Sequence, residues 1–143
     1  MGDEQPRSNE DKLISIFIPG NVPSSKNSKE IIRFKKNGKW ISGLTDSKLV
    51  KKYYETTKLN YMRRKPKFHK LIDLTSPPYR IEFTFVRNSK HQFDYVNPLQ
   101  TVQDQMVKTK WLEDDNSDIL IPSFGEYQYS KNSPGVIIKV LGI

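Results

Sequence analysis

In residues 79–86, read as YRIEFTFV, apolar and polar side chains alternate from Tyr79 to Phe85. Successive side chains of a β-strand point to opposite faces of the sheet, so a period of two is typical of a strand with one buried face. The segment therefore predicts a half-buried strand of a central sheet. Beyond it the chain runs through residues 87–90 into an acidic stretch, which places that stretch at a strand end, where functional loops are common.

Shorter segments predict the rest of the sheet. The apolar run Leu13–Ile18 is bounded by Pro19-Gly20 and indicates a buried strand. Asn37-Gly38 favours a type I′ turn, because this dipeptide tolerates positive φ at both central positions, so a small hairpin is expected there. Closing strands are expected at residues 119–121, 125–129 and 135–141.

A first helix is expected to open at Thr45-Asp46-Ser47 and to run to about Arg64. Pro66 is expected to end it, which leaves residues 65–78 as a connection. Four residues at helical spacing form its inward stripe, and the two tyrosines among them are interpreted as core packing rather than base-stacking surfaces. These residues are Val50, Tyr54, Thr57 and Tyr61.

A second helix is expected from Asn97, with this residue as N-cap and Pro98 in the first turn. At 100° per residue it has a polar face of Asn97, Gln100 and Asp104 and an opposite apolar face of Leu99, Val102 and Met106. The whole pattern predicts a mixed α/β (α+β) fold with a small mixed sheet and two main helices. Residues 1–11 are expected to be a flexible tail, and residues 12–143 a single domain.

Composition narrows the class of protein. The 143 residues include 24 Lys+Arg against 16 Asp+Glu, a net charge of +8, which favours phosphate backbones or another anionic partner. The chain has no cysteine, so disulfides and thiolate zinc sites are excluded, and its two histidines are too few to suggest a histidine metal centre. Apolar runs are too short for a membrane span and the first residues are polar, so a cytoplasmic protein without a membrane partner is expected.

Acidic residues are concentrated in residues 91–119, which contain five aspartates. Asp94 precedes the second helix, whereas Asp114 and Asp115 follow it. If the chain folds back after the helix, these carboxylates converge near one end of it, and converging oxygen ligands hold hard divalent cations.

The same residues carry a family resemblance. Asp94, Asn97, Gln100 and Asp104, followed by Trp111-Leu112-Glu113-Asp114-Asp115, resemble in spacing the acidic motif of RusA-like Holliday-junction resolvases, which are phage-type endonucleases. Gly20–Asn27 resembles the Pro-x-x-Lys-Asn loop of that family, and Pro134–Ile138 its closing strand. The resemblance extends over roughly residues 13–141.

The resemblance implies a Mg²⁺- or Mn²⁺-dependent nuclease that acts on branched DNA as a homodimer. Two positions differ, because Val96 replaces a metal-binding aspartate of the family and Gln100 its catalytic lysine. We expect Asp94, Asp115 and Asp104 as metal ligands, and Asp94, Asp115 and Asp114 as the catalytic set. The expected DNA contacts are Lys26, Asn27, Arg87, Lys90, Asn97, Gln100, Lys108 and Lys110.

Two other functions stay open. The replacements at Val96 and Gln100 also fit a relative that binds DNA branches without cutting them. A phage or host regulatory protein that uses the fold for protein contacts is the third hypothesis.

Overall fold

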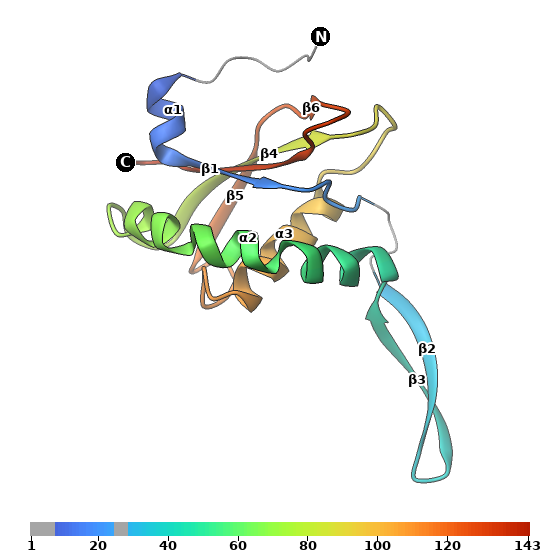
Figure 1. The fold of residues 1–143 in the computed structure, drawn as a ribbon. Helices are drawn as coiled ribbons and strands as arrows, with labels where there is room; N and C mark the ends of the chain where they lie inside the picture. Colours follow the sequence, from blue (N-terminus) through green and yellow to red (C-terminus); the bar gives the residue numbers. More distant parts are fainter. Residues whose placement is uncertain (1–7, 25–28) are drawn as a thin grey trace.

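The computed structural model describes residues 8–24 and 29–143 (Figure 1). Over these residues the fold is mixed α+β, as predicted, with three helices, a mixed sheet of five strands and a separate two-stranded sheet. The helices are α1 (Asn9–Ile14), α2 (Lys48–Ile72) and α3 (Val96–Lys108). The strands are β1 (Ser15–Pro19), β2 (Lys29–Lys36), β3 (Lys39–Asp46), β4 (Tyr79–Arg87), β5 (Leu120–Phe124), β6 (Gln128–Tyr129) and β7 (Gly135–Val140).

The predicted strand at 79–86 is β4, and it lies at the centre of the larger sheet. The strand order is β1-β7-β4-β5, and β6 also pairs with β4. β7 is antiparallel to β4, whereas β5 and β6 are parallel to it. Ile81, Phe83 and Phe85 are buried as the alternation predicted, but burial is continuous from Phe83 to Arg87. The end of β4 nearest the acidic motif is therefore enclosed on both faces.

One glycine of the sheet is required by a close approach of backbone. A Cβ on Gly135, at the start of β7, would collide with the carbonyl oxygen of Ile18 and with the ring of Phe17. Gly135 pairs with Pro19 of β1. The pairing of β1 with β7 therefore requires a residue without a side chain at position 135.

Helix α2 is longer than expected, because Pro66 lies inside it and the helix continues to Ile72. A proline in a helix interior removes one backbone hydrogen bond and costs about 3 kcal/mol. Here Pro66 and Met62, whose carbonyl loses its donor, are both on the exposed side, where water can bond that carbonyl. Three buried residues after the proline, Phe68, Leu71 and Ile72, pack into the core and offset the cost. The prediction that residues 65–72 form a connection was wrong.

Helix α1 begins inside residues 1–11, which the sequence indicated as a tail. Ser8 caps it by accepting a hydrogen bond from the Asp11 N–H at 3.1 Å. Lys139 of β7 forms a salt bridge with Asp11, with 2.8 Å between Nζ and Oδ1. The first strand therefore starts at Ser15, and Leu13 and Ile14 belong to the helix.

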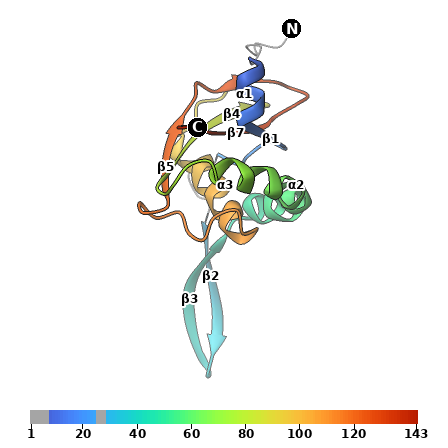
Figure 2. The same ribbon diagram turned by 90° about the vertical axis from the view of Figure 1, so that its left-hand side faces the viewer.

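The predicted hairpin is confirmed as β2–β3, residues 29–46, which we term the arm. Asn37 has a φ of 54° and Gly38 a φ of 77°, so both central residues of the turn are left-handed, as a type I′ turn requires. The arm projects away from the rest of the molecule in both views (Figures 1 and 2). We term the remaining elements the body.

None of the helices in the described part of the chain combines the length and the apolar character that crossing a membrane requires.

Candidate functional site

Helix α3 carries the acidic motif on its surface. Its buried side contains Leu99, Val102 and Met106, as the helical spacing predicted. Gln100 is exposed, and Val96 is 64% exposed, so the two positions that depart from the resolvase pattern face solvent. The helix begins two residues earlier than predicted, because Tyr95 rather than Asn97 stands at the N-cap, without a side-chain cap. Asn97 is in the first turn instead.

The chain reverses direction at the end of α3. Lys110 adopts a left-handed φ of 66°, and the Trp111 N–H donates to the Met106 carbonyl at 2.8 Å, while the Lys110 N–H donates to Val107 at 3.1 Å. These two bonds form a Schellman motif, with a lysine where glycine is usual. Trp111 is 1% exposed, and its Nε1 donates to the Tyr61 carbonyl at 2.8 Å, which anchors the reversal in the core.

The reversal brings Asp115 back alongside the helix. Gln103 Nε2 donates to Asp115 Oδ2 at 3.0 Å. Gln103 is 8% exposed, and its Oε1 is buried without a hydrogen-bond partner among the described residues. The buried amide therefore positions the carboxylate on the surface of α3. No sequence pattern around Gln103 indicates this role, because the role depends on a contact made across the reversal.

Asp114 shapes the exposed turn rather than pointing at the helix. The Asp115 N–H donates to Asp114 Oδ1 at 2.7 Å, and Asn116 Nδ2 donates to Oδ2 at 3.0 Å. The backbone bond from Asp115, followed by the bond from Asn116, holds the pKa of the Asp114 carboxyl below its ordinary value.

Asp104 belongs to the contact between α2 and α3. Its carboxylate accepts hydrogen bonds from the Tyr54 hydroxyl at 3.4 Å and from Gln100 Nε2 at 2.8 Å. Burial, with Asp104 as a further cause, raises the pKa of Tyr54 above its ordinary range. Lys108 Nζ lies 4.4 Å from the centre of the Tyr54 ring. Because eight residues separate Asp104 from the start of the helix, it lies about 12 Å along the axis from Val96.

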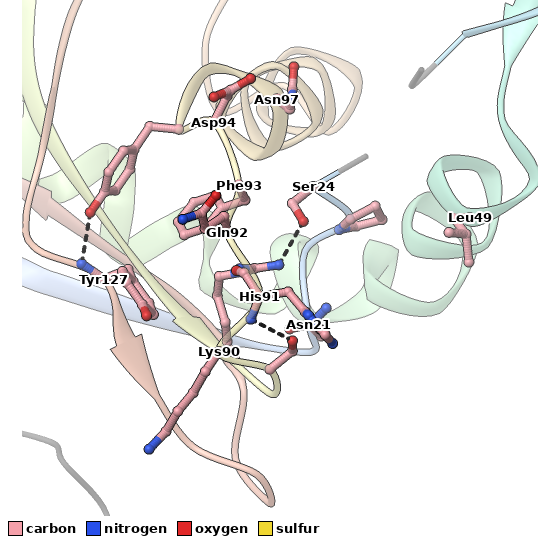
Figure 3. Close-up of a pocket in the computed structure, with 14 residues that line it drawn as sticks. Asn21, Ser24, Leu49, Lys90, His91, Gln92, Phe93, Asp94, Asn97 and Tyr127 are labelled. Atoms are coloured by element: carbon pink, nitrogen blue, oxygen red, sulfur yellow. Dashed lines mark hydrogen bonds between the residues drawn. The ribbon is translucent and has the colours of Figure 1, made fainter. Parts of the chain in front are cut away.

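Asp94 lines a pocket of about 890 Å³ beside the N-terminus of α3, which we term the Asp94 pocket (Figure 3). Figure 3 shows the Asp94 carboxylate on the same side of the pocket as Asn97. Four stretches meet there: the loop after β1, the start of α2, the segment from the end of β4 into α3, and the loop between β5 and β6. Lining residues include Asn21, Ser24, Leu49, Arg87, Lys90 and Tyr127.

Arg87 gives this pocket a built-in positive charge. It is 7% exposed, and it donates through Nη1 to the His91 carbonyl at 2.6 Å and through Nη2 to Ser24 Oγ at 2.8 Å. The guanidinium carbon lies 4.0 Å from the centre of the Phe93 ring. Nε is buried without a partner among the described residues. Burial lowers the pKa of Arg87, which Tyr127 partly opposes, but a guanidinium stays charged at neutral pH.

The other residues predicted to contact DNA do not lie together. Lys90 lines the pocket, but its ammonium extends away from the other labelled side chains and lies 4.9 Å from the centre of the Tyr129 ring (Figure 3). Lys110 lines a separate pocket of about 720 Å³ together with His69. Lys26 and Asn27 lie outside the described residues. Over residues 8–24 and 29–143, no three His, Cys, Asp or Glu side chains are grouped to hold a metal ion.

The Asp94 pocket thus unites Asp94, Asn97, Arg87 and Lys90, whereas Asp104, Asp114 and Asp115 have separate partners further along α3 and in the turn beyond it. Ser24, from the Gly20–Asn27 loop noted in the sequence, also lines the pocket, and so does Tyr127, which no sequence pattern indicated. No protein-family model matches the chain, and no curated protein matches it.

Proposed function

We propose that the protein is a metal-dependent endonuclease that cuts branched DNA, acting as a homodimer in the cytoplasm. The observation that carries this proposal is the Asp94 pocket, which is lined by both an exposed carboxylate, Asp94, and a buried guanidinium, Arg87. A cation held by the carboxylate and a phosphate held by the guanidinium is the pairing that phosphodiester hydrolysis requires. The resemblance to RusA-like resolvases rests on the same stretch of chain.

Two carboxylates of the acidic motif supply the type of oxygen ligand that a hard divalent ion binds. Asp94 is exposed, and Asp115 uses Oδ2 for its bond with Gln103, which leaves Oδ1 for a further ligand. Carboxylate oxygens are the protein ligands that Mg²⁺ prefers, often as one or two groups supplemented by water. In this proposal Asp94, in the pocket, and Asp115, beside Gln103, would hold Mg²⁺ or Mn²⁺. When bound, the ion supplies a water acidified for attack and neutralises charge on the leaving oxygen.

The residues of the chain have separate tasks in this proposal. Arg87 binds a phosphate oxygen through its guanidinium, because charge-assisted hydrogen bonds to phosphate are strong and directional. Gln103 fixes the direction of Asp115. Gln100 cannot neutralise transition-state charge, so a lysine takes that part, and the candidates are Lys26, Lys90, Lys108 and Lys110.

A second function, binding of DNA branches without cleavage, is favoured by one feature of α3. Val96 is 64% exposed where a third carboxylate would stand, and the Gln100 amide is engaged with Asp104. A site with one carboxylate fewer has less charge with which to dehydrate Mg²⁺. Both functions share the same DNA-binding surface, so cleavage and binding must be measured separately.

Incubation of a labelled four-way junction with the protein, with and without Mg²⁺, tests the proposal. We expect cleavage only with the metal, and we expect Asp115→Asn to reduce the rate by roughly 100-fold or more while junction binding is retained. Asp118→Asn, an exposed aspartate in the same turn, is the matched control and is expected to cut normally.

Three results would decide between the functions. Normal cleavage by Asp115→Asn would remove Asp115 from the site. Tight junction binding without cleavage at any Mg²⁺ or Mn²⁺ concentration would favour the binding protein. A junction affinity that does not fall with salt would contradict both, because phosphate contacts release counterions.

A further inference from the structure

The arm is the part of the molecule that the proposed site does not use. It consists of two eight-residue antiparallel strands, with Lys36 paired with Lys39 at the tip. At about 3.4 Å per residue the arm extends roughly 27 Å from its base. Isolated two-stranded hairpins are marginally stable in water, so an arm of this length that stays exposed points to a partner.

Residues 31–42 of the arm have one sign of charge. They contain four cations and no carboxylate: Arg33, Lys35, Lys36 and Lys39. Every one of these twelve residues is exposed. Like charges so close together repel, and an anionic partner removes that repulsion, which is the charge complementarity expected of a nucleic-acid contact.

The two faces of the arm differ. The register places Lys35 opposite Trp40 and Phe34 opposite Ile41, on opposite faces of the hairpin. Phe34 and Ile41 are 40% and 37% exposed, so they partly cover each other, whereas Trp40 is 60% exposed. Arg33 and Lys35 both lie over the Trp40 ring, at 5.6 and 5.2 Å from its centre. The more open face is therefore aromatic and cationic.

The base of the arm joins the body at the Asp94 pocket. Ser24, five residues before β2, lines that pocket, and so does Leu49, three residues after β3. Any DNA strand in the pocket thus lies at the foot of the arm. A duplex that leaves the pocket along the arm would be followed for about eight base pairs, at about 3.4 Å per base pair.

We propose that the arm is a second nucleic-acid contact, which binds the duplex that flanks the Asp94 pocket. A two-stranded β-ribbon fits the major groove of B-DNA, which is about 12 Å wide. The tip lysines contact the phosphate backbone, and Trp40 with its two cations lies against the duplex. This inference rests on the proposed function only for the identity of the ligand as DNA.

The fluorescence of Trp40 can report DNA binding to the arm directly, because the only other tryptophan, Trp111, is 1% exposed. We expect acrylamide to quench the fluorescence of Trp40 in the free protein and a 20-base-pair duplex to protect it. A neutral quencher is chosen because the charge of the arm does not attract it. The Trp40→Phe variant records the remaining signal of Trp111 and serves as the baseline.

Charge-neutralised variants test how much the cations of the arm contribute to the affinity for duplex DNA. The arm variant is Lys35→Gln, Lys36→Gln and Lys39→Gln, and its matched control removes three exposed cations from α2: Lys58→Gln, Arg63→Gln and Lys70→Gln. Loss of three phosphate contacts should weaken duplex binding roughly tenfold or more and reduce the slope of log affinity against log salt by about 2.7. We expect the α2 control to retain the slope of the parent protein.

Equal affinity and equal salt slope in the arm variant and the parent would overturn the inference. So would protection of Trp40 by vesicles of phosphatidylserine and phosphatidylcholine but not by duplex, which would assign the arm to membranes. A change of sedimentation in the arm variant, with DNA affinity unchanged, would overturn it in favour of a second copy of the chain.

The two proposals fail in different ways. A parent protein that binds duplex through the arm but never cuts a junction contradicts the nuclease and leaves the arm contact standing. A parent protein that cuts a junction, together with an arm variant that binds and cuts equally well, contradicts only the arm contact.

Discussion

The body and the arm hold one tryptophan each, in opposite environments. Trp111 in the body is 1% exposed, stacks on Phe68 with ring centres 4.7 Å apart and bonds the Tyr61 carbonyl. Trp40 in the arm is 60% exposed, and its ring contacts are with cations of the same hairpin. The body is thus stabilised by burial between distant segments, whereas the arm is held by its turn and by pairing between neighbouring strands.

Because of this difference, side chains of the body determine the stability of the fold, whereas side chains of the arm can serve recognition of a partner. A side chain removed from the body leaves a cavity, while a side chain removed from the arm leaves only solvent. The arm is therefore free to carry residues chosen for a partner. If stability and recognition are separate in this way, substitutions in the body and in the arm should have unequal effects.

Replacement of the two tryptophans should give unequal losses of stability. We expect Trp111→Ala to lower the free energy of unfolding by about 3–5 kcal/mol, because it leaves a large cavity and removes the indole hydrogen bond to the Tyr61 carbonyl. Trp40→Ala should change it by less than about 0.5 kcal/mol, as surface substitutions do. Urea unfolding followed by circular dichroism measures both. Comparable losses would mean that the arm contributes to the core.

Gly38→Val should loosen the arm alone. Gly38 has a φ of 77°, and a Cβ there meets nothing within 4 Å, so the cost of about 1–2 kcal/mol is backbone strain without collision. Amide hydrogen exchange should become faster across residues 29–46 and stay unchanged in β4. Gly142→Val, at a φ of 81° near the C-terminus, carries the same strain and should leave the exchange of the arm unchanged. Faster exchange throughout the body would contradict the separation.

The turn that holds Asp114 is exposed, as the arm is, but it is fixed by hydrogen bonds. The fold lowers the pKa of this carboxyl, so its small stabilising effect is present above the ordinary carboxyl pKa of about 3.9 and is lost as pH falls through the lowered value. NMR titration should find Asp114 below that ordinary value. Asn116→Ala should raise the pKa only in part, because the Asp115 N–H is the larger cause, and Ser117→Ala should leave it unchanged.

Local signals made the arm predictable from sequence. Asn37-Gly38 determines the turn through its own φ preferences, and the register of two strands follows from a two-residue turn. The same holds for β4, whose alternating pattern is complete within nine residues. The apolar face of α3 was also predicted correctly, because helical spacing alone determines it.

Long-range contacts explain the errors in the body. Pro66 was expected to end α2, but burial of Phe68, Leu71 and Ile72 in the core keeps the helix intact. Helix α1 was missed because a salt bridge to Lys139 lies far away in sequence. Neither contact leaves a pattern in the residues around it.

The candidate site was predictable only in its parts. The acidic residues and Arg87 were identified from their residue type and position. The pairing of Gln103 with Asp115, however, depends on the left-handed conformation of Lys110, and this position lacks the glycine that usually indicates such a conformation. Likewise, Asp104 was expected as a metal ligand because it belongs to the acidic motif that resembles the resolvases. Its partners Tyr54 and Gln100 show a structural use that the helical pattern does not reveal.

The arm starts and finishes at the same place, since its first residue, Lys29, pairs with its last, Asp46. A segment whose two ends are paired in this way can be replaced by another hairpin without moving the residues that flank it. Residues added or removed in equal numbers from its two strands change its reach and leave the spacing of its ends as it was. The length and the side chains of the hairpin can thus be changed while α3 and the sheet keep their register.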